Sequence, residues 1–259
     1  MHPPTQSRPI DARGEQLRAD QPSPLVLLCE HASDALPPED ARAAHPADLP
    51  WLGTHWGVDL GAGPLTRALS ARLGAPALLG VVSRLVCDLN RPEDHPELAR
   101  PEVEGHRLGF NAALDAAARA RRVERWHRPW HAAADALVGA HRHRSRLLLS
   151  VHSFTPCYLG QRREVELGVL YDDHEPEALA LHAALQARWP GGRDRVRLNE
   201  PWSGKAGLIY SPARHANTHG LPTLELELRQ DLIETPAQVA AVTALVAEAL
   251  GAVLGETSD

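Results

Sequence analysis

Two predicted strands end in a histidine, at the kind of position where reactive groups gather in open α/β sheets. Residues 147–156, LLLSVHSFTP, form an apolar run typical of a strand buried on both faces, and this run reaches His152. Residues 24–33, PLVLLCEHAS, end in the same way at His31. A buried strand rarely finishes in an imidazole without a use for it, so both histidines are candidates for chemistry.

A zinc site is the first chemistry that these residues suggest. Catalytic zinc takes three protein ligands, commonly including histidines and a carboxylate, and keeps a fourth position for water. His31 and His152 would supply the imidazoles. The carboxylate is either Asp34, which makes a His-x-x-Asp step with His31, or Asp59, near the start of the next predicted helix. Spacing does not choose between them, and the alternative for each histidine is a buried ring bonded to a backbone carbonyl.

The segment 83–92, SRLVCDLNRP, is typical of an anion receptor. The planar guanidinium of Arg91 can meet a carboxylate with two parallel hydrogen bonds, and Asn90 beside it can donate a third. The alternative is an ordinary salt bridge of Arg91 at a strand end.

The segment 221–232, LPTLELELRQDL, offers a general base. Strand alternation places three leucines on one face and Glu225, Glu227 and Arg229 on the other. Two carboxylates on one face of a core-like strand are costly unless they are paired or used. We expect one to pair with Arg229, which leaves the other free to accept a proton.

The elements that must position these residues alternate between strands and helices. Strands are predicted at 24–33, 76–84, 84–90, 147–152, 165–172, near 193–198, at 207–211 and at 223–229, and helices at 58–74, 105–122, 128–142, 176–188 and 236–251. This alternation predicts a mostly parallel sheet covered on both faces. Residues 1–23, rich in proline and without periodicity, are expected to be a flexible N-terminal arm, and residues 24–259 a single α/β hydrolytic domain.

The bulk composition excludes several classes of protein. The 259 residues are 43% hydrophobic, which can fill one large core, and the net charge of −6 provides no basic face for nucleic acid. Three cysteines cannot all pair, so a reducing cytoplasm is expected. The N-terminus lacks the features of a secretory signal, and no uninterrupted apolar stretch reaches the roughly 18 residues of a membrane span. We therefore expect a cytoplasmic protein that acts on a small molecule, away from membranes, with its oligomeric state open.

The fifteen histidines are a high count. Four of them, His127, His131, His141 and His143, fall in a helical pattern and are predicted to lie on helix surfaces or ends. They are not expected to take part in the chemistry.

Five motifs in fixed order, EHASDALP, VDLGA, SRLVCDLNRP, HSFTP and LELELRQDL, resemble the N-formylglutamate amidohydrolase family. Members of that family resemble zinc carboxypeptidases and aspartoacylase-type deacylases in fold. The resemblance spans residues 29–232 and leaves out the arm and the last helix. It implies a three-layer αβα fold with a mixed, mostly parallel central sheet, similar to the zinc carboxypeptidases (phosphorylase/hydrolase-like). It also implies a metal-dependent hydrolase of a linear amide C–N bond.

The resemblance also implies a ligand set. In zinc carboxypeptidases one ligand follows the first catalytic strand, an acidic ligand starts the next helix, and the third lies in a strand-end His-Ser pair. His31 and His152 match the first and third. The usual His-x-x-Glu is absent, and Asp34 is one methylene too short. If residues 35–57 are an insertion, Asp59 takes the place of the glutamate, and Asp59 is favoured.

Roles in catalysis follow from the same resemblance. The DLNR segment is similar to the Asn-Arg pair that grips the substrate carboxylate, which points to Asn90 and Arg91. Arg84 is the candidate for polarising the scissile carbonyl, and the strand TLELELR selects Glu227 as the catalytic glutamate. The implied substrate is N-formyl-L-glutamate, an intermediate of histidine breakdown, cleaved to formate and glutamate with one Zn²⁺.

Other functions remain open from the sequence. The substrate could be another N-acyl amino acid. A carboxypeptidase-like metallopeptidase would keep the same metal set, a non-catalytic binding relative would have lost the metal, and other divalent ions accept similar ligands. A serine hydrolase at Ser153 is disfavoured because no Gly-x-Ser-x-Gly turn surrounds it. The segment 199–204 and the residues Tyr210, Arg214 and His215 could line the pocket.

Overall fold

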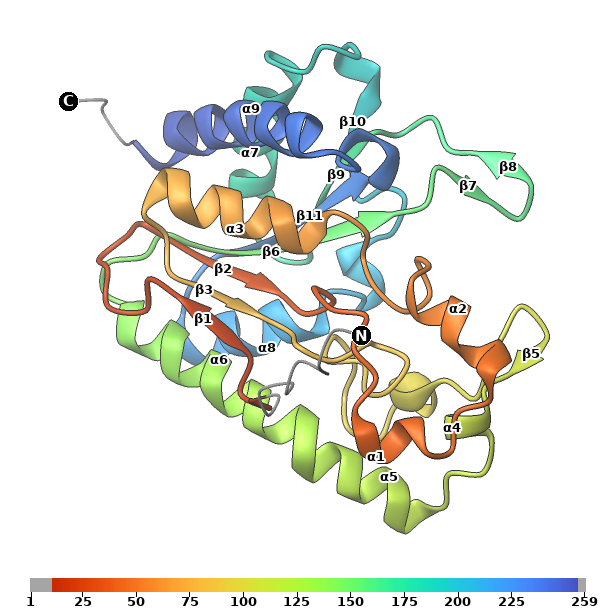
Figure 1. Ribbon diagram of the computed structural model, residues 1–259. Helices are drawn as coiled ribbons and strands as arrows, with labels where there is room; N and C mark the ends of the chain where they lie inside the picture. Colours follow the sequence, from red (N-terminus) through yellow and green to blue (C-terminus); the bar gives the residue numbers. More distant parts are fainter. Residues whose placement is uncertain (1–10, 256–259) are drawn as a thin grey trace, which may run out of the picture.

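A seven-stranded mixed sheet forms the middle layer of the computed structural model, which describes residues 11–255 (Figure 1). In spatial order its strands are β1 (Glu15–Leu17), β3 (Ala77–Leu79), β2 (Leu25–Cys29), β6 (Leu147–Phe154), β11 (Thr223–Arg229), β9 (Leu167–Leu170) and β10 (Val196–Leu198). Neighbouring strands are parallel except in the β1–β3 and β9–β11 pairs. The predicted mixed, mostly parallel sheet is confirmed.

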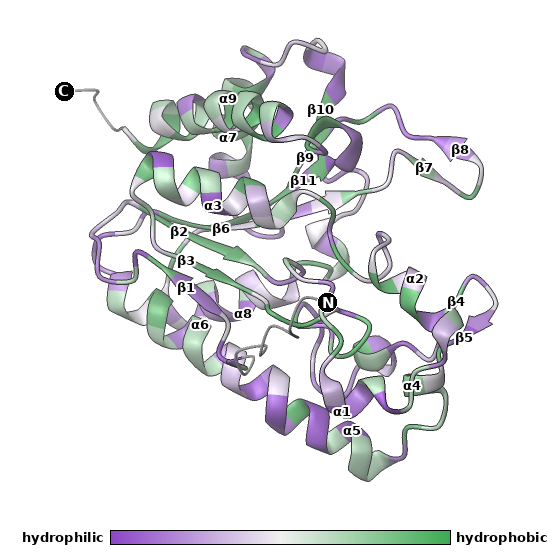
Figure 2. Ribbon diagram, in the orientation of Figure 1, coloured by the Kyte–Doolittle hydropathy of each residue, from purple (hydrophilic) through white to green (hydrophobic). Residues whose placement is uncertain are grey.

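Helices cover both faces of the sheet, which completes the predicted three layers (Figure 1). One face carries α3 (Ala62–Leu73), α7 (Glu175–Gln186) and α9 (Pro236–Leu254), and the other carries α6 (Arg128–His141) and α8 (Tyr210–His219). Because strand side chains alternate, Leu27 of β2 packs in the first core and its neighbour Leu28 in the second. Both faces are apolar, and hydrophobic residues concentrate in the central strands (Figure 2).

Shorter elements connect the layers. They are α1 (Pro38–Ala41), α2 (Leu49–Leu52), α4 (Gly109–Ala112), α5 (Ala116–Arg122), a π-helical turn (Val123–His127), and the two-stranded ribbons β4 (Glu102–Val103) with β5 (His106–Arg107) and β7 (Cys157–Tyr158) with β8 (Gln161–Arg162). The predicted helix at 105–122 is therefore wrong in its first part, where β5 and α4 lie. Asp115 ends that irregular stretch because its side chain accepts from the backbone N–H of Ala118 and caps α5.

Two glycines fix the ends of α3. Gly61 and Gly74 flank the helix with φ of 82° and 62°, a backbone region that favours glycine. A Cβ at Gly61 would lie 2.5 Å from the carbonyl oxygen of Ile233, so a side chain has no room there. The prediction that Gly74 ends this helix is confirmed, and the predicted helices at 176–188 and 236–251 are confirmed as α7 and α9.

Two predicted strands are wrong. Residues 84–90 form a buried loop of turns, in which the backbone N–H groups of Val86 and Cys87 donate to the Ser83 carbonyl at 2.9 and 3.3 Å. Residues 207–211 run into the first turn of α8, which begins at Tyr210. In both stretches local turn or helix hydrogen bonds satisfy backbone N–H and C=O groups. The apolar side chains would have been equally compatible with a buried strand.

One part of the predicted N-terminal arm belongs to the central sheet. Residues 1–10 lie outside the described residues, whereas Glu15–Leu17 forms β1 and pairs with β3. The expectation of an unstructured arm is wrong for this strand. The division into an arm and one domain otherwise stays a prediction.

Helix α9 is long and apolar enough to cross a membrane, judged by length and composition alone. It packs against α3 and α7, and its residues Val246 and Leu250 are fully buried in the core on that face of the sheet. These contacts are those of a core helix.

Candidate functional site

A cleft of about 290 Å³ opens at the carboxyl ends of β2, β6 and β11. The loops that follow β2 and β3, the segment before α3 and the ribbon β7–β8 contribute the remaining walls. The cleft thus lies where parallel strands end together, as expected for an α/β enzyme.

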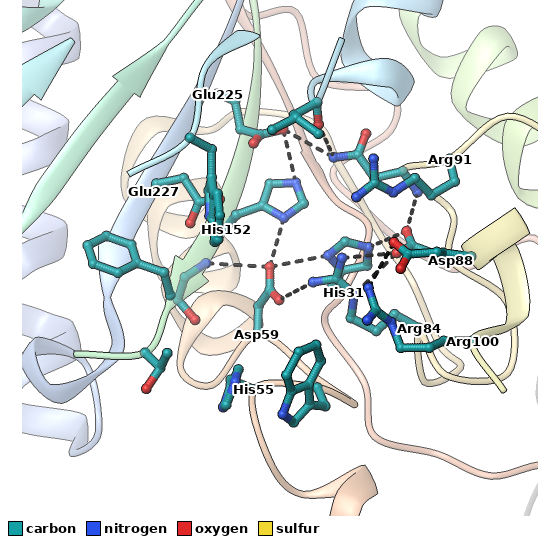
Figure 3. Close-up of a pocket in the computed structure, with 18 of the residues that line it drawn as sticks. His31, His55, Asp59, Arg84, Asp88, Arg91, Arg100, His152, Glu225 and Glu227 are labelled. Atoms are coloured by element: carbon teal, nitrogen blue, oxygen red, sulfur yellow. Dashed lines mark hydrogen bonds and ion pairs between the residues drawn. The ribbon is translucent and has the colours of Figure 1, made fainter. Parts of the chain in front are cut away.

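The candidate metal ligands meet at the floor of this cleft (Figure 3). His31, Asp59 and His152 each offer one ligand atom, these atoms lie within 4.8 Å of one another, and the three residues are at most 3% exposed. The Nδ1 atoms of His31 and His152 lie 3.3 and 2.7 Å from the same atom, Asp59 Oδ2. Asp34, the other candidate carboxylate, is exposed and lies outside the group.

Carboxylates also lie next to the Nε2 atoms of both imidazoles, opposite the Nδ1 atoms that approach Asp59. His31 Nε2 lies 2.7 Å from Asp88 Oδ1, and His152 Nε2 lies 3.1 Å from Glu30 Oε2 and 3.3 Å from Glu225 Oε2. Metal-bound histidines characteristically carry such a partner on the second nitrogen, because it fixes the ring and raises its basicity.

Two of the donor distances can be compared with those around a small divalent cation. Two ligand atoms about 2.1 Å from a tetrahedral ion lie roughly 3.4 Å apart. The distance between His31 Nδ1 and Asp59 Oδ2 is 3.3 Å, and that between His152 Nδ1 and Asp59 Oδ2 is shorter, 2.7 Å. Burial by itself would raise the pKa of Asp59, but the two imidazoles lower it below its ordinary value, so this carboxylate is charged and able to bind a metal.

The loop after β3 supplies the remaining predicted residues. The Arg84 guanidinium contacts Asp88 Oδ2 at 2.9 Å and Asp59 Oδ1 at 3.3 Å, beside the candidate metal ligands. Arg91 lines the cleft and forms no ion pair within residues 11–255. Asn90 is less free than the sequence suggested, since its side chain accepts from Ser211 N–H at 2.8 Å and donates to the carbonyl of Leu208 at 3.2 Å.

The two glutamates of β11 differ in their surroundings. Glu225 accepts a hydrogen bond from the Asn90 amide at 3.3 Å, whereas Glu227 Oε2 is buried without a hydrogen-bond partner in the described part of the chain. In the view of Figure 3, Glu227 and Arg91 lie on opposite sides of His152. The expected pairing with Arg229 is wrong, because Arg229 reaches Asp231 at 2.8 Å and Glu166 at 3.4 Å instead.

Burial sets the proton affinity of both glutamates. It raises the pKa of Glu225 to about 7 and that of Glu227 well above its ordinary value. A carboxylate with a raised pKa is a better proton acceptor, which suits Glu227 to general base chemistry. Glu227 lines the same cleft as His31, Asp59 and His152.

The other candidates from the sequence have structural roles or none at the cleft. Ser153 donates its hydroxyl to the Leu60 carbonyl at 2.8 Å, and no histidine in the described part of the chain accepts from it. Trp202 of segment 199–204 lines the cleft, whereas Tyr210, Arg214 and His215 do not.

The partners of the imidazoles were not singled out from the sequence. Glu30 and Asp88 stand in the strand-end stretches, and Ser150, whose hydroxyl lies 2.5 Å from Glu30 Oε2, precedes His152 by two residues and so shares its face of β6. That same-face spacing is the signal that could have identified Ser150. The contacts of Glu30 and Asp88 with the imidazoles could be recognised only once the loops were seen folded.

A histidine cluster packs against the loop after β3, where His127 Nε2 lies 2.8 Å from the carbonyl oxygen of Arg91. His127, His131 and His141 were expected on helix surfaces, but all three are buried. His131 Nδ1 lies 2.9 Å from His215 Nε2, with the rings stacked, and His127 packs against His131 at 4.2 Å between ring centroids. The helical pattern could not reveal this because α8 and the loops cover this side of α6.

Acid is expected to destabilise the protein through this cluster. Burial lowers the pKa of His131 to about 2 and that of His215 to about 4, whereas the unfolded-state pKa is about 6.5. Below pH 6.5 these two histidines therefore bind protons in the unfolded chain but stay neutral in the folded protein. The free energy of unfolding decreases as the pH is lowered. We expect each histidine to cost about 1.5 kcal/mol between pH 6.5 and 5. Urea unfolding at pH 6.5 and at pH 5 measures this change in the free energy of unfolding.

The variant His131→Phe should show a weaker pH dependence over this window, and the exposed His143, changed to Gln, serves as the matched control. An unchanged pH dependence in His131→Phe would contradict the neutral buried state of His131.

Comparison with known proteins identifies the family. The model of the N-formylglutamate amidohydrolase family matches residues 23–234. The crystal structure of gene product Atu2144 from Agrobacterium tumefaciens is 31% identical, covers 93% of this chain and 94% of its own, and superposes with a TM-score of 0.84. The N-formylglutamate amidohydrolase from Ralstonia eutropha JMP134 has 19% identity, 88% and 92% coverage, and a TM-score of 0.67, a likeness of fold.

No curated protein sequence is significantly similar to the chain. The family match nevertheless extends over every segment that supplies the cleft, from the strand before His31 to the end of β11. The chain belongs to the N-formylglutamate amidohydrolase family, and it is a hydrolase that acts on an amide bond.

Proposed function

We propose that this protein hydrolyses N-formyl-L-glutamate to formate and L-glutamate in a zinc-dependent reaction, as part of cytoplasmic histidine breakdown. The observation that carries the proposal is the meeting of His31, Asp59 and His152 in one cleft. The same cleft is lined by Glu227, whose Oε2 has no hydrogen-bond partner among residues 11–255, and by Arg91, which has no ion pair within that range. This set contains a metal site, a base and a receptor for a carboxylate.

Zinc fits the donor set better than the harder cations do. Magnesium and calcium prefer oxygen ligands, whereas two imidazoles and one carboxylate suit zinc. When bound by His31, Asp59 and His152, zinc would polarise the scissile carbonyl and make a water more acidic.

The chain's own residues would carry the proton and the developing charge. Glu227 takes the proton of the attacking water and returns it to the leaving amine. Arg84 uses three of its five N–H donors on Asp59 and Asp88, which leaves two for the oxygen that becomes negative. Arg91 holds the substrate carboxylate and so fixes the amide over the ligands. Asn90, the other predicted donor, already uses both amide N–H groups on the Leu208 carbonyl and Glu225, so it supports this loop and does not grip the substrate.

The size of the cleft favours a small substrate over a peptide. Its volume of about 290 Å³ is at the lower end of the range for ligand pockets, which suits an acyl amino acid. The buried, partner-free Glu227 favours an enzyme over a binding relative, because an idle buried carboxylate costs folding energy.

The test is glutamate release from N-formyl-L-glutamate by the purified protein, before and after a chelator removes metal and zinc is returned. We expect activity to disappear on stripping and to return with zinc. Metal-replete protein that is inert on N-formyl-L-glutamate contradicts the substrate. Activity that survives complete stripping contradicts the metal mechanism.

Asp88 is expected to tighten the metal site through His31. In Asp88→Asn the ring loses its charged partner at 2.7 Å, and such partners of metal-bound histidines are worth about 10- to 100-fold in metal affinity. Competition with a chromogenic chelator measures the zinc affinity. Asp94→Asn, an exposed change in the same loop, is the control, and equal affinity in both variants would contradict the role of Asp88.

A further inference from the structure

Four guanidiniums line the cleft, and two of them have carboxylate partners. Arg84 is paired with Asp59 and Asp88, and Arg100 is paired with Glu97 at 2.8 Å. Arg91 and Arg163 have no such partner among residues 11–255. Two unpaired cations remain in a cleft for a small substrate.

Arg163 is held in place by aromatic rings. Its guanidinium carbon lies 4.7 Å from the ring centroid of Trp202, 4.9 Å from that of Tyr158 and 5.5 Å from that of Phe154, and all three rings line the cleft. Such contacts fix the cation without neutralising it. Among residues 11–255 its side chain makes one hydrogen bond, from Nη1 to the Thr155 carbonyl at 3.3 Å.

The position of Arg163 is tied to the strands that carry the reaction centre. Phe154 lies two residues beyond His152 on β6, and Arg229, which donates to the Arg163 carbonyl at 3.2 Å, lies two residues beyond Glu227 on β11. Two residues of strand span about 7 Å. Arg163 is thus anchored a short step outward from the ligands and the base.

We propose that Arg163 is a specificity-determining residue that binds the side-chain carboxylate of the substrate, while Arg91 binds the α-carboxylate. The enzyme would thereby select N-acyl derivatives of dicarboxylic amino acids. This inference rests on the proposed function. A neutral side chain would leave the half-buried guanidinium of Arg163 unpaired, and a site built for a charged group rejects an analogue that lacks it.

The test compares N-formyl-L-glutamate with its neutral isostere, N-formyl-L-glutamine. In the zinc-loaded wild type we expect kcat/KM to favour the glutamate derivative by at least tenfold. In Arg163→Met we expect a loss of about 10- to 150-fold with N-formyl-L-glutamate, the effect of one charge-assisted pair, and less than threefold with N-formyl-L-glutamine. Arg163→Lys should keep part of the preference. Arg162→Met, an exposed neighbour in β8, is the matched control and should behave as the wild type.

Equal losses with both substrates in Arg163→Met, or a wild type indifferent between them, would overturn the inference and leave the amidohydrolase function standing. If neither substrate is cleaved, the proposed function fails, and binding then decides the inference. Glutarate, which keeps the spacing of the two carboxylates, should bind the wild type at least tenfold more tightly than butyrate, and this difference should vanish in Arg163→Met. Equal binding of the two acids by the wild type would overturn the inference in that case.

Discussion

Replacing Asp59 by Asn is expected to abolish stable zinc binding and, with it, hydrolysis. The Nδ1 atoms of His31 and His152 both approach Asp59 Oδ2, at 3.3 and 2.7 Å. An amide in place of this carboxylate cannot supply its negative charge. Loss of a direct ligand should weaken zinc binding by well over 100-fold, since even outer partners of zinc ligands are worth about 10- to 100-fold. Metal analysis of the purified variant and competition with a chelator measure the change.

Asp34→Asn is the matched control for this experiment. Asp34 was the rival carboxylate on sequence grounds, and it is exposed outside the group of ligands. Its variant should bind zinc and hydrolyse substrate as the wild type does. If Asp59→Asn does not fold, His152→Ala, which removes another of the three ligands, provides the test and should show the same loss of zinc binding. Full zinc content in both Asp59→Asn and His152→Ala would show that the ion binds elsewhere.

Replacing Glu227 by Gln is expected to remove catalysis while leaving the metal in place. Glu227 contacts none of the metal ligands by a hydrogen bond, and its Oε2 has no partner in the described chain, so the amide changes the proton chemistry alone. Loss of a general base typically costs about 100- to 10,000-fold in rate. Steady-state kcat on N-formyl-L-glutamate and zinc content, measured on the same preparation, give both readouts.

Glu225→Gln is the informative comparison, because it makes the same change two residues earlier on the same face of β11. Glu225 contacts Asn90 and His152, so its variant should affect zinc binding before it affects the rate of the zinc-saturated enzyme. Equal losses of kcat in the two zinc-saturated variants would contradict the assignment of the general base to Glu227 alone.

Much of the fold could be predicted because its signals are local. The apolar runs at β2 and β6 and the alternation at β11 read directly as strands, and Gly74 ended α3 where the sequence placed it. The segment 84–90 has equally apolar residues but folds as turns, since its hydrogen bonds close on Ser83 and its side chains pack on the α6 face. Apolar content alone does not distinguish the two outcomes.

The sequence by itself determined which residue types would meet. His31 follows β2 and His152 lies near the end of its parallel neighbour β6, so the topology of the sheet brings them to one edge, and the motif order indicates the family. The resemblance favoured Asp59 over Asp34, and only the tertiary structure shows Asp59, and not Asp34, beside the two histidines. The chain between β2 and α3 must turn back so that the Asp59 N–H donates to the His31 carbonyl at 3.0 Å, and a turn of that length is not encoded by local spacing.

The same reason explains why Arg163 and the buried histidine cluster were missed. Arg163 follows β8 at the end of an exposed ribbon, and its aromatic neighbours come from β6, β7 and the segment before α8. His131 meets His215 across 84 residues of chain. Contacts between residues this far apart depend on how layers pack, which the periodicity of a single segment does not record. Local pattern therefore determined the elements and the residues at their ends, and packing decided their partners.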